Sequence, residues 1–108
     1  MDLTPADAAS RIESGAAELV DVREPYEWEA GRIEGARHVP IPELAALAEE
    51  LDPERPVVFV CRVGARSAMA ADAFRKGGYE AYSLAGGLEA WAGDGRSLEP
   101  EDGSVASH

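Results

Sequence analysis

The sequence has almost no cysteine and almost no lysine. Of its 108 residues only Cys61 is a cysteine, and of its ten basic residues only Lys76 is a lysine. A single cysteine excludes an internal disulfide and a cysteine-rich zinc site. It also leaves no second thiol in the chain that could resolve an oxidised Cys61.

Long apolar runs are missing as well. No segment is long enough to span a bilayer. The start of the chain, Met1–Thr4, lacks the basic and apolar regions of a signal peptide. We therefore expect a cytoplasmic location, because a reducing compartment keeps a thiol free and supplies thiol acceptors.

Positive charge is scarce: 21 acidic residues against 10 basic ones give a formal net charge of −11. Phosphate binding needs basic patches, so we expect neither a nucleic-acid partner nor a membrane surface. The length suits one domain, which we place at residues 3–96. From residue 97 the chain is rich in Gly, Ser and acidic residues, and we expect 97–108 to form a flexible C-terminal tail.

What is present is a short stretch with chemical character. Residues 57–60 (Val-Val-Phe-Val) are predicted to form a buried strand, because the run is apolar, rich in β-branched residues, bounded by Pro56 and too short for a buried helix. The run stops at Cys61, a loop containing Gly64 follows, and a helical pattern covers 67–76. In an open α/β sheet, ligands bind at the carboxyl ends of the strands. Cys61 therefore occupies a position where a ligand site is expected.

The residues around Cys61 favour a reactive thiol. A thiol is nucleophilic only as the thiolate, which a helix N-terminus and neighbouring arginines stabilise. Arg62 and Arg66 supply the charge, and the N–H groups of the loop can curl around the sulfur because Gly64 tolerates the backbone angles required. The alternative is a buried cysteine that packs as a small hydrophobe. We favour the reactive thiol, since an inert one has no use for two adjacent cations.

Strands and helices alternate along the rest of the chain. Strands are expected at 18–22, 36–39, 57–60 and 79–84, and helices at 4–15, 24–30, 42–51, 67–76 and 86–91. This alternation predicts an α/β fold with a mainly parallel sheet. Asp21 and Arg23 then share an edge with Cys61. Asp21 reads best as half of an ion pair that fixes the loop, whereas Arg23 either binds a substrate anion or pins the rim of the site.

Four segments of the chain occur together in one known family. They are Asp-Val-Arg-Glu-Pro-Tyr-Glu-Trp at 21–28, Gly-Arg-Ile-Glu-Gly-Ala at 31–36, Cys-Arg-Val-Gly-Ala-Arg-Ser at 61–67 and Leu-Ala-Gly-Gly-Leu-Glu-Ala-Trp at 84–91. In this order they resemble the single-domain rhodaneses, which are thiosulfate:acceptor sulfurtransferases. The resemblance covers about residues 3–96, and Arg32 stands where the family usually has His.

The resemblance implies a rhodanese-like α/β fold, with a mainly parallel five-stranded sheet flanked by helices on both faces. It implies that Cys61 is catalytic and takes a sulfane sulfur, as a persulfide, from a donor such as thiosulfate for delivery to cyanide or a thiol. No metal or organic cofactor is required, and Asp21 and Arg23 support the site. The substrate-binding residues that the resemblance carries over are Arg62, Val63, Gly64, Ala65, Arg66 and Ser67.

Other functions stay open at this point. Classical two-domain rhodaneses often have Lys where this loop has Val63, so thiosulfate binding is expected to be weaker and a protein persulfide is an alternative donor. A sulfur carrier or regulatory module that acts only with a protein partner is therefore the first alternative. A Cys-loop phosphatase is the second and is disfavoured, because the stretch between Cys61 and Arg66 is one residue shorter than such loops use.

Overall fold

A computed structural model describes residues 2–107. The elements in chain order are β1 (Asp2–Leu3), α1 (Pro5–Glu13), β2 (Glu18–Asp21), α2 (Pro25–Ala30), β3 (Arg37–His38), the 3₁₀ turn η1 (Ile41–Glu43), α3 (Leu44–Ala48), β4 (Val57–Val60), α4 (Ala65–Lys76), β5 (Ala81–Leu84) and α5 (Gly87–Gly93). Within the described residues, the helices and strands alternate as the sequence predicts.

The strands form one five-stranded sheet in the order β1-β5-β4-β2-β3. Every pairing is parallel, so the predicted mainly parallel sheet is confirmed and is parallel throughout the described chain. β4 lies at the centre, and all four of its residues are buried. The strands therefore end at one shared edge, and Cys61 follows the central strand there.

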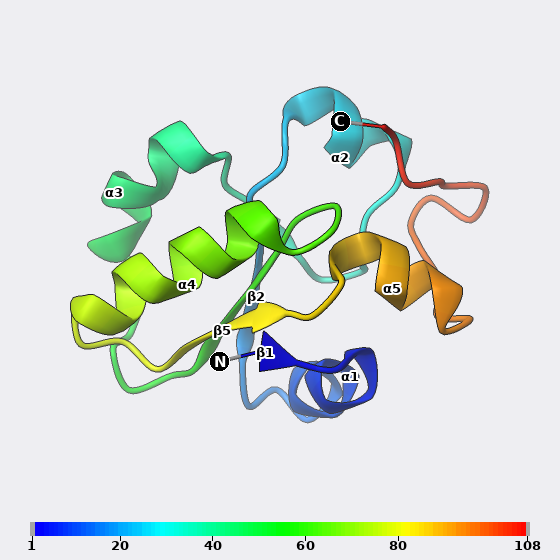
Figure 1. Ribbon diagram of the computed structural model, residues 1–108. Helices are drawn as coiled ribbons and strands as arrows, with labels where there is room; N and C mark the ends of the chain where they lie inside the picture. Colours follow the sequence, from blue (N-terminus) through cyan, green and yellow to red (C-terminus); the bar gives the residue numbers. More distant parts are fainter. Residues whose placement is uncertain (1, 108) are drawn as a thin grey trace.

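Helices cover both faces of this sheet, as expected (Figure 1). Side chains alternate between the faces of a strand, and β4 shows this directly. Val58 and Val60 pack in a cluster with residues of α1 and α5, whereas Val57 and Phe59 pack in a cluster with residues of α3 and α4. The two half-cores hold the central strand rigidly and thereby fix the position of Cys61.

Several element boundaries differ from the sequence prediction. α4 begins at Ala65, two residues before the predicted start at 67, because Gly64 adopts a left-handed conformation (φ 111°) that turns the chain into the helix. The helix predicted at 42–51 is a 3₁₀ turn followed by α3, which ends at Ala48. β1 had no sequence signal of its own, since it has two residues and is defined by its pairing with β5.

The segment expected to be a flexible tail lies against the α2–β3 connection. Arg32 and Glu99 exchange backbone hydrogen bonds, with N···O distances of 2.9 and 2.6 Å, and Ser104 N–H donates to Ala30 O at 2.8 Å. Leu98 and Val105 pack on the core. The flexibility expected for residues 97–108 stays a prediction. Among the described residues, no helix is long and apolar enough to cross a membrane.

Candidate active site

The loop at 61–64 connects the central strand to α4 and carries the thiol. The side chain of Cys61 is buried, with the residue 1% exposed. The backbone N–H groups of Gly64 and Ser67 point at its Sγ, at 3.1 and 3.4 Å. The hydroxyl of Ser67 lies 3.4 Å from the same atom. The thiol is therefore enclosed by hydrogen-bond donors, an environment that stabilises negative charge on sulfur.

Arg62 of the loop and Arg66 in the first turn of α4 are both paired with carboxylates. Arg66 forms a two-pronged ion pair with Glu27, at 2.8 and 3.0 Å, and the Glu27 side chain is fully buried. The hydrogen bond to Glu27 raises the pKa of Arg66 above its ordinary value, so this guanidinium stays charged. Arg62 pairs with Glu89 at 2.7 Å in a more exposed position. Each cation is thus held beside the loop by a partner from another helix.

Glu27 and Glu89 were not singled out from the sequence. Both lie inside the four segments that carry the family resemblance. The segments mark these positions but do not show which arginine each glutamate pairs with. Glu27 belongs to α2, 39 residues before Arg66 in the chain, and only the fold brings the two together. Charge matching across elements is not readable from local periodicity.

Asp21 and Arg23 form a buried ion pair at the end of β2. Arg23 Nη2 lies 2.7 Å from Asp21 Oδ2 and also donates to Gly31 O at 2.7 Å. Neither hydrogen bond involves Cys61, and the side chains of Asp21 and Arg23 are both fully buried. The pair joins the turn after β2 to Gly31, at the end of α2. Such a contact fits the supporting role expected for Asp21 and Arg23. His38 contacts the same turn through a hydrogen bond between its Nε2 and Arg23 O at 2.8 Å.

The loop at 61–64 is fastened on a further side by the start of α5. Leu88 N–H donates to Cys61 O at 2.8 Å and Glu89 N–H donates to Arg62 O at 3.0 Å. This approach requires glycine at Gly87, since a Cβ there would lie 2.5 Å from Cys61 O. The neighbouring Gly86 is also closely packed, since a Cβ there would lie 2.6 Å from Ala90 Cβ.

A second buried hydroxyl lies next to that of Ser67. Ser83 of β5 is 1% exposed, and its Oγ lies 2.7 Å from Ser67 Oγ. Ser67 Oγ also lies 3.2 Å from Gly64 O. Ser83 was missed from the sequence, because a serine in a strand carries no signal of what lies opposite it.

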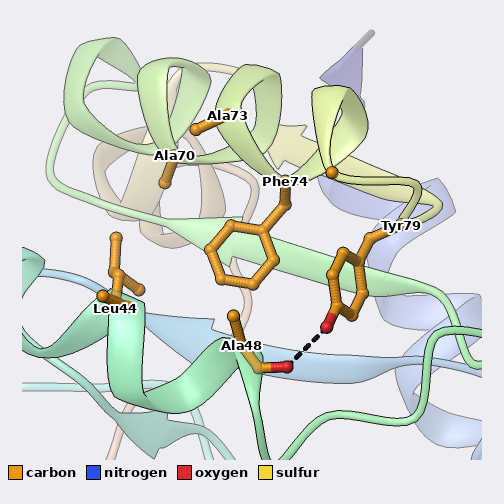
Figure 2. Close-up of a pocket in the computed structure, with 8 residues that line it drawn as sticks. Leu44, Ala48, Ala70, Ala73, Phe74 and Tyr79 are labelled. Atoms are coloured by element: carbon orange, nitrogen blue, oxygen red, sulfur yellow. Dashed lines mark hydrogen bonds between the residues drawn. The ribbon is translucent and has the colours of Figure 1, made fainter.

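Outside the loop, the described residues form an apolar groove and no cluster of metal ligands. Within residues 2–107, no group of three or more His, Cys, Asp or Glu side chains lies close enough to hold a metal ion. A groove of about 310 Å³ runs between α3 and α4, lined mainly by apolar side chains such as Leu44 and Phe74 (Figure 2). Its polar feature is the Tyr79 hydroxyl, which donates to Ala48 O. No cysteine, serine or threonine lines this groove.

The family model of the rhodanese-like domain matches residues 4–94. The chain belongs to the rhodanese-like domain family. Its relatives include the thiosulfate sulfurtransferase GlpE of Pseudomonas aeruginosa (strain LESB58), 35% identical over 91% of this chain and 86% of that protein. The uncharacterized protein YqhL of Bacillus subtilis (strain 168) is 44% identical over 71% of this chain, and the match spans 62% of its own length.

Solved structures agree with the fold of this rhodanese-like domain. The crystal structure of a rhodanese-related protein from Thermoplasma volcanium superposes with a TM-score of 0.82 and 29% sequence identity. The superposition covers 90% of this chain and 95% of that one. The rhodanese-like fold expected from the four segments is therefore confirmed, and the roles of the individual site residues stay predictions.

Proposed function

We propose that this rhodanese-like domain is a sulfurtransferase that carries a sulfane sulfur as a persulfide on Cys61. The observation that carries the proposal is the cradle: the sole thiol of the chain lies at the start of α4 with the N–H groups of Gly64 and Ser67 directed at its sulfur. The relative that is named a thiosulfate sulfurtransferase supports the same reaction class.

The reaction is a double displacement on sulfur. The Cys61 thiolate attacks the outer sulfur of the donor, a new S–S bond forms, and the old bond breaks with its electron pair leaving on the donor remainder. With thiosulfate the remainder is sulfite. A nucleophilic acceptor, cyanide or a thiolate, then attacks the terminal sulfur of the persulfide and regenerates the Cys61 thiolate. Each step transfers one sulfur atom and leaves one electron pair on the departing group. This is nucleophilic covalent catalysis by the thiolate.

The residues of the loop have separate roles in this scheme. The N–H groups of Gly64 and Ser67 stabilise charge on the Cys61 sulfur before attack and after release. The backbone at Val63 and Ala65 shapes the loop around the incoming sulfur. Arg66, held by Glu27, keeps a positive charge beside the nucleophile.

The charges of the site bear on the donor. Both loop guanidiniums face carboxylates, so a dianion such as thiosulfate has to compete with Glu27 and Glu89 for them. Val63 is half-exposed and apolar, and adds no charge to the mouth of the loop. We propose that thiosulfate is accepted at high concentration and that a donor of lower charge, such as an organic persulfide, is preferred.

A second candidate is a carrier that works only with a protein partner. Three of the exposed large apolar side chains, Ile41, Val63 and Met69, lie at or beside the loop. Ile41 and Met69 line one groove together with Arg66. Exposed apolar surface of this kind is typical of protein interaction sites. Sulfur transfer that occurs only when a partner protein is present would favour this candidate over a free-standing enzyme.

The proposal is tested by intact-mass spectrometry of the protein after exposure to thiosulfate. We expect the mass to rise by one sulfur atom, cyanide to remove that atom as thiocyanate, and Cys61→Ser to show neither change. Because serine and cysteine have nearly the same size, thermal unfolding should show that the variant stays folded. Thiocyanate production that survives Cys61→Ser would contradict the proposal, and Cys61-dependent hydrolysis of an aryl phosphate would favour the phosphatase instead.

A further inference from the structure

Ser83 is a buried polar side chain that the proposed reaction has not used. It lies in β5 between apolar neighbours, and the residue is 1% exposed. A hydroxyl buried without a hydrogen bond destabilises a fold, so a buried serine is expected to have a partner. The side-chain partner of Ser83 is Ser67 Oγ, at 2.7 Å, which is the distance of a good O–H···O bond.

The hydrogens of the two serines can be counted. Ser67 Oγ has one hydrogen and three neighbours: Cys61 Sγ at 3.4 Å, Gly64 O at 3.2 Å and Ser83 Oγ at 2.7 Å. A hydroxyl donates once and accepts up to twice. If Ser67 gave its hydrogen to Ser83, neither the sulfur nor the carbonyl would receive it.

The opposite direction leaves the Ser67 hydrogen available for one of the two other acceptors. When Ser83 donates to Ser67 Oγ, the hydrogen of Ser67 is free to point at the sulfur or at Gly64 O. A thiolate is the stronger acceptor of the two, because hydrogen bonds to charged groups are about twice as strong as neutral ones. A hydroxyl that accepts a hydrogen bond is also polarised into a better donor.

We propose that Ser83 is a positioning residue for the sulfur transfer. It donates to Ser67 Oγ and so directs the Ser67 hydrogen onto the Cys61 thiolate. When the sulfur becomes the inner atom of a persulfide it loses its charge, and the hydrogen turns back to Gly64 O. No proton leaves either serine, and only the orientation of one O–H bond changes. This inference rests on the proposed role of Cys61 as the nucleophile.

The competing explanation is that the two serines only fasten α4 to β5. That role predicts a loss of stability with no change in the thiol. The two explanations are separated by a reaction of Cys61 that needs neither a sulfur donor nor an acceptor, namely alkylation by iodoacetamide, a neutral reagent, at a fixed pH.

The sharpest comparison is Ser83→Thr against Ser83→Val. The two side chains have the same shape and differ in the hydroxyl, so any strain from the extra methyl group is common to both. We expect the threonine variant to alkylate within about twofold of the wild-type rate and the valine variant to alkylate about three- to tenfold more slowly, a net hydrogen-bond effect of the usual size. The kcat for sulfur transfer should fall with the alkylation rate, whereas KM for the donor should change less than twofold.

A double-mutant comparison and a stability control complete the test. Ser83→Ala should match valine in the wild-type background and have no further effect in a Ser67→Ala background, because Ser83 acts through Ser67. Ala81→Gly, in the same strand and equally buried, is the control that lowers stability without touching the hydroxyls, and its alkylation rate should stay at the wild-type value.

The outcomes discriminate between the claims. Equal alkylation of the threonine and valine variants, or an undiminished effect of Ser83→Ala in the Ser67→Ala background, would overturn the positioning role and leave the proposed function standing. The opposite outcome is also distinct. If the valine variant is alkylated more slowly but Cys61 never gains sulfur, the proposed function is refuted, while the effect of Ser83 on the thiol through Ser67 stands.

Discussion

The loops after β4 and β5 are neighbours with the same plan and opposite roles. Each leads from a strand into a helix through a glycine with positive φ, 111° at Gly64 and 72° at Gly86. The first loop surrounds a sulfur atom with N–H groups. The second directs its N–H groups, those of Leu88 and Glu89, at carbonyls of the first loop.

The difference teaches how the candidate site is built. The N–H groups of Gly64 and Ser67 are directed at the Cys61 sulfur. The carbonyls of Cys61 and Arg62 still need partners, because buried carbonyls are normally hydrogen-bonded. The loop after β5 satisfies both of them. The candidate site thus lies in one loop, and backbone hydrogen bonds from the other hold that loop in place.

Gly87→Ala should break this division of roles with the largest effect. The new Cβ would lie 2.5 Å from Cys61 O and from Arg62 C, and φ at this position is 62°. We expect overpacking to destabilise the fold by about 1–3 kcal/mol and the left-handed conformation to add about 1–2 kcal/mol. Denaturant unfolding and Cys61 alkylation should both report the damage.

Gly95→Ala is the matched control for that variant. Its φ is 79°, yet no atom lies within 4 Å of a Cβ at this position. It should therefore show only the conformational cost, with wild-type alkylation of Cys61. Equal behaviour of the two variants would mean that α5 does not support the cysteine loop.

Gly64→Ala sharpens the comparison from the other side. A Cβ there would make only ordinary contacts, 3.5 Å from Gly86 N at the nearest, so the effect comes from the backbone angle of 111°. We expect a cost of about 1–2 kcal/mol, together with a fall in kcat of about tenfold, because relaxation of φ moves the Gly64 N–H group away from the sulfur. Kinetics beside thermal unfolding would separate the two effects.

Gly15→Ala, with a φ of 76° and open space around the Cβ position, serves as the control for strain alone. It should lose similar stability and keep full sulfur transfer. A Gly64→Ala enzyme as active as this control would show that the Gly64 N–H group does not contribute to catalysis.

Glu89→Gln should have the smallest effect. It removes the ion pair that links the side chains of the two loops, but Arg62 and Glu89 are 34% and 44% exposed. Exposed pairs contribute about 0.2–1 kcal/mol and weaken with salt. We expect a change within that range by denaturant unfolding, and Asp94→Asn, which breaks the exposed pair with Arg96, should behave alike. A loss comparable with that of Gly87→Ala would show that the side chains, and not the backbone bonds, join the loops.

Much of the fold was predictable because its signals are local. Thr4 caps α1 by accepting a hydrogen bond from Asp7 N–H, as a capping pattern indicates. The apolar run of β4 and the glycine after Cys61 marked the strand, the turn and the helix start to within two residues. These features depend on residues close in sequence, whose preferences survive in almost any tertiary context.

The tail shows where local signals end. Its polar composition predicts flexibility, yet Ser104 lies so close to Gly31 that a Cβ on that glycine would overlap its backbone, at 2.7 Å from Ser104 N. Composition reports how little apolar area a segment can bury. It does not report whether the segment can pack against the backbone of a glycine far away in the sequence.

By itself, then, the sequence determined the parallel α/β architecture, the family and the one thiol on which the proposed chemistry depends. Tertiary structure alone decided that Glu27 meets Arg66, that Ser83 lies under Ser67 and that α5 supports the cysteine loop. The physical reason is range: helix caps and turns form between residues a few positions apart, whereas the charges and hydroxyls of the site meet only after the strands have paired.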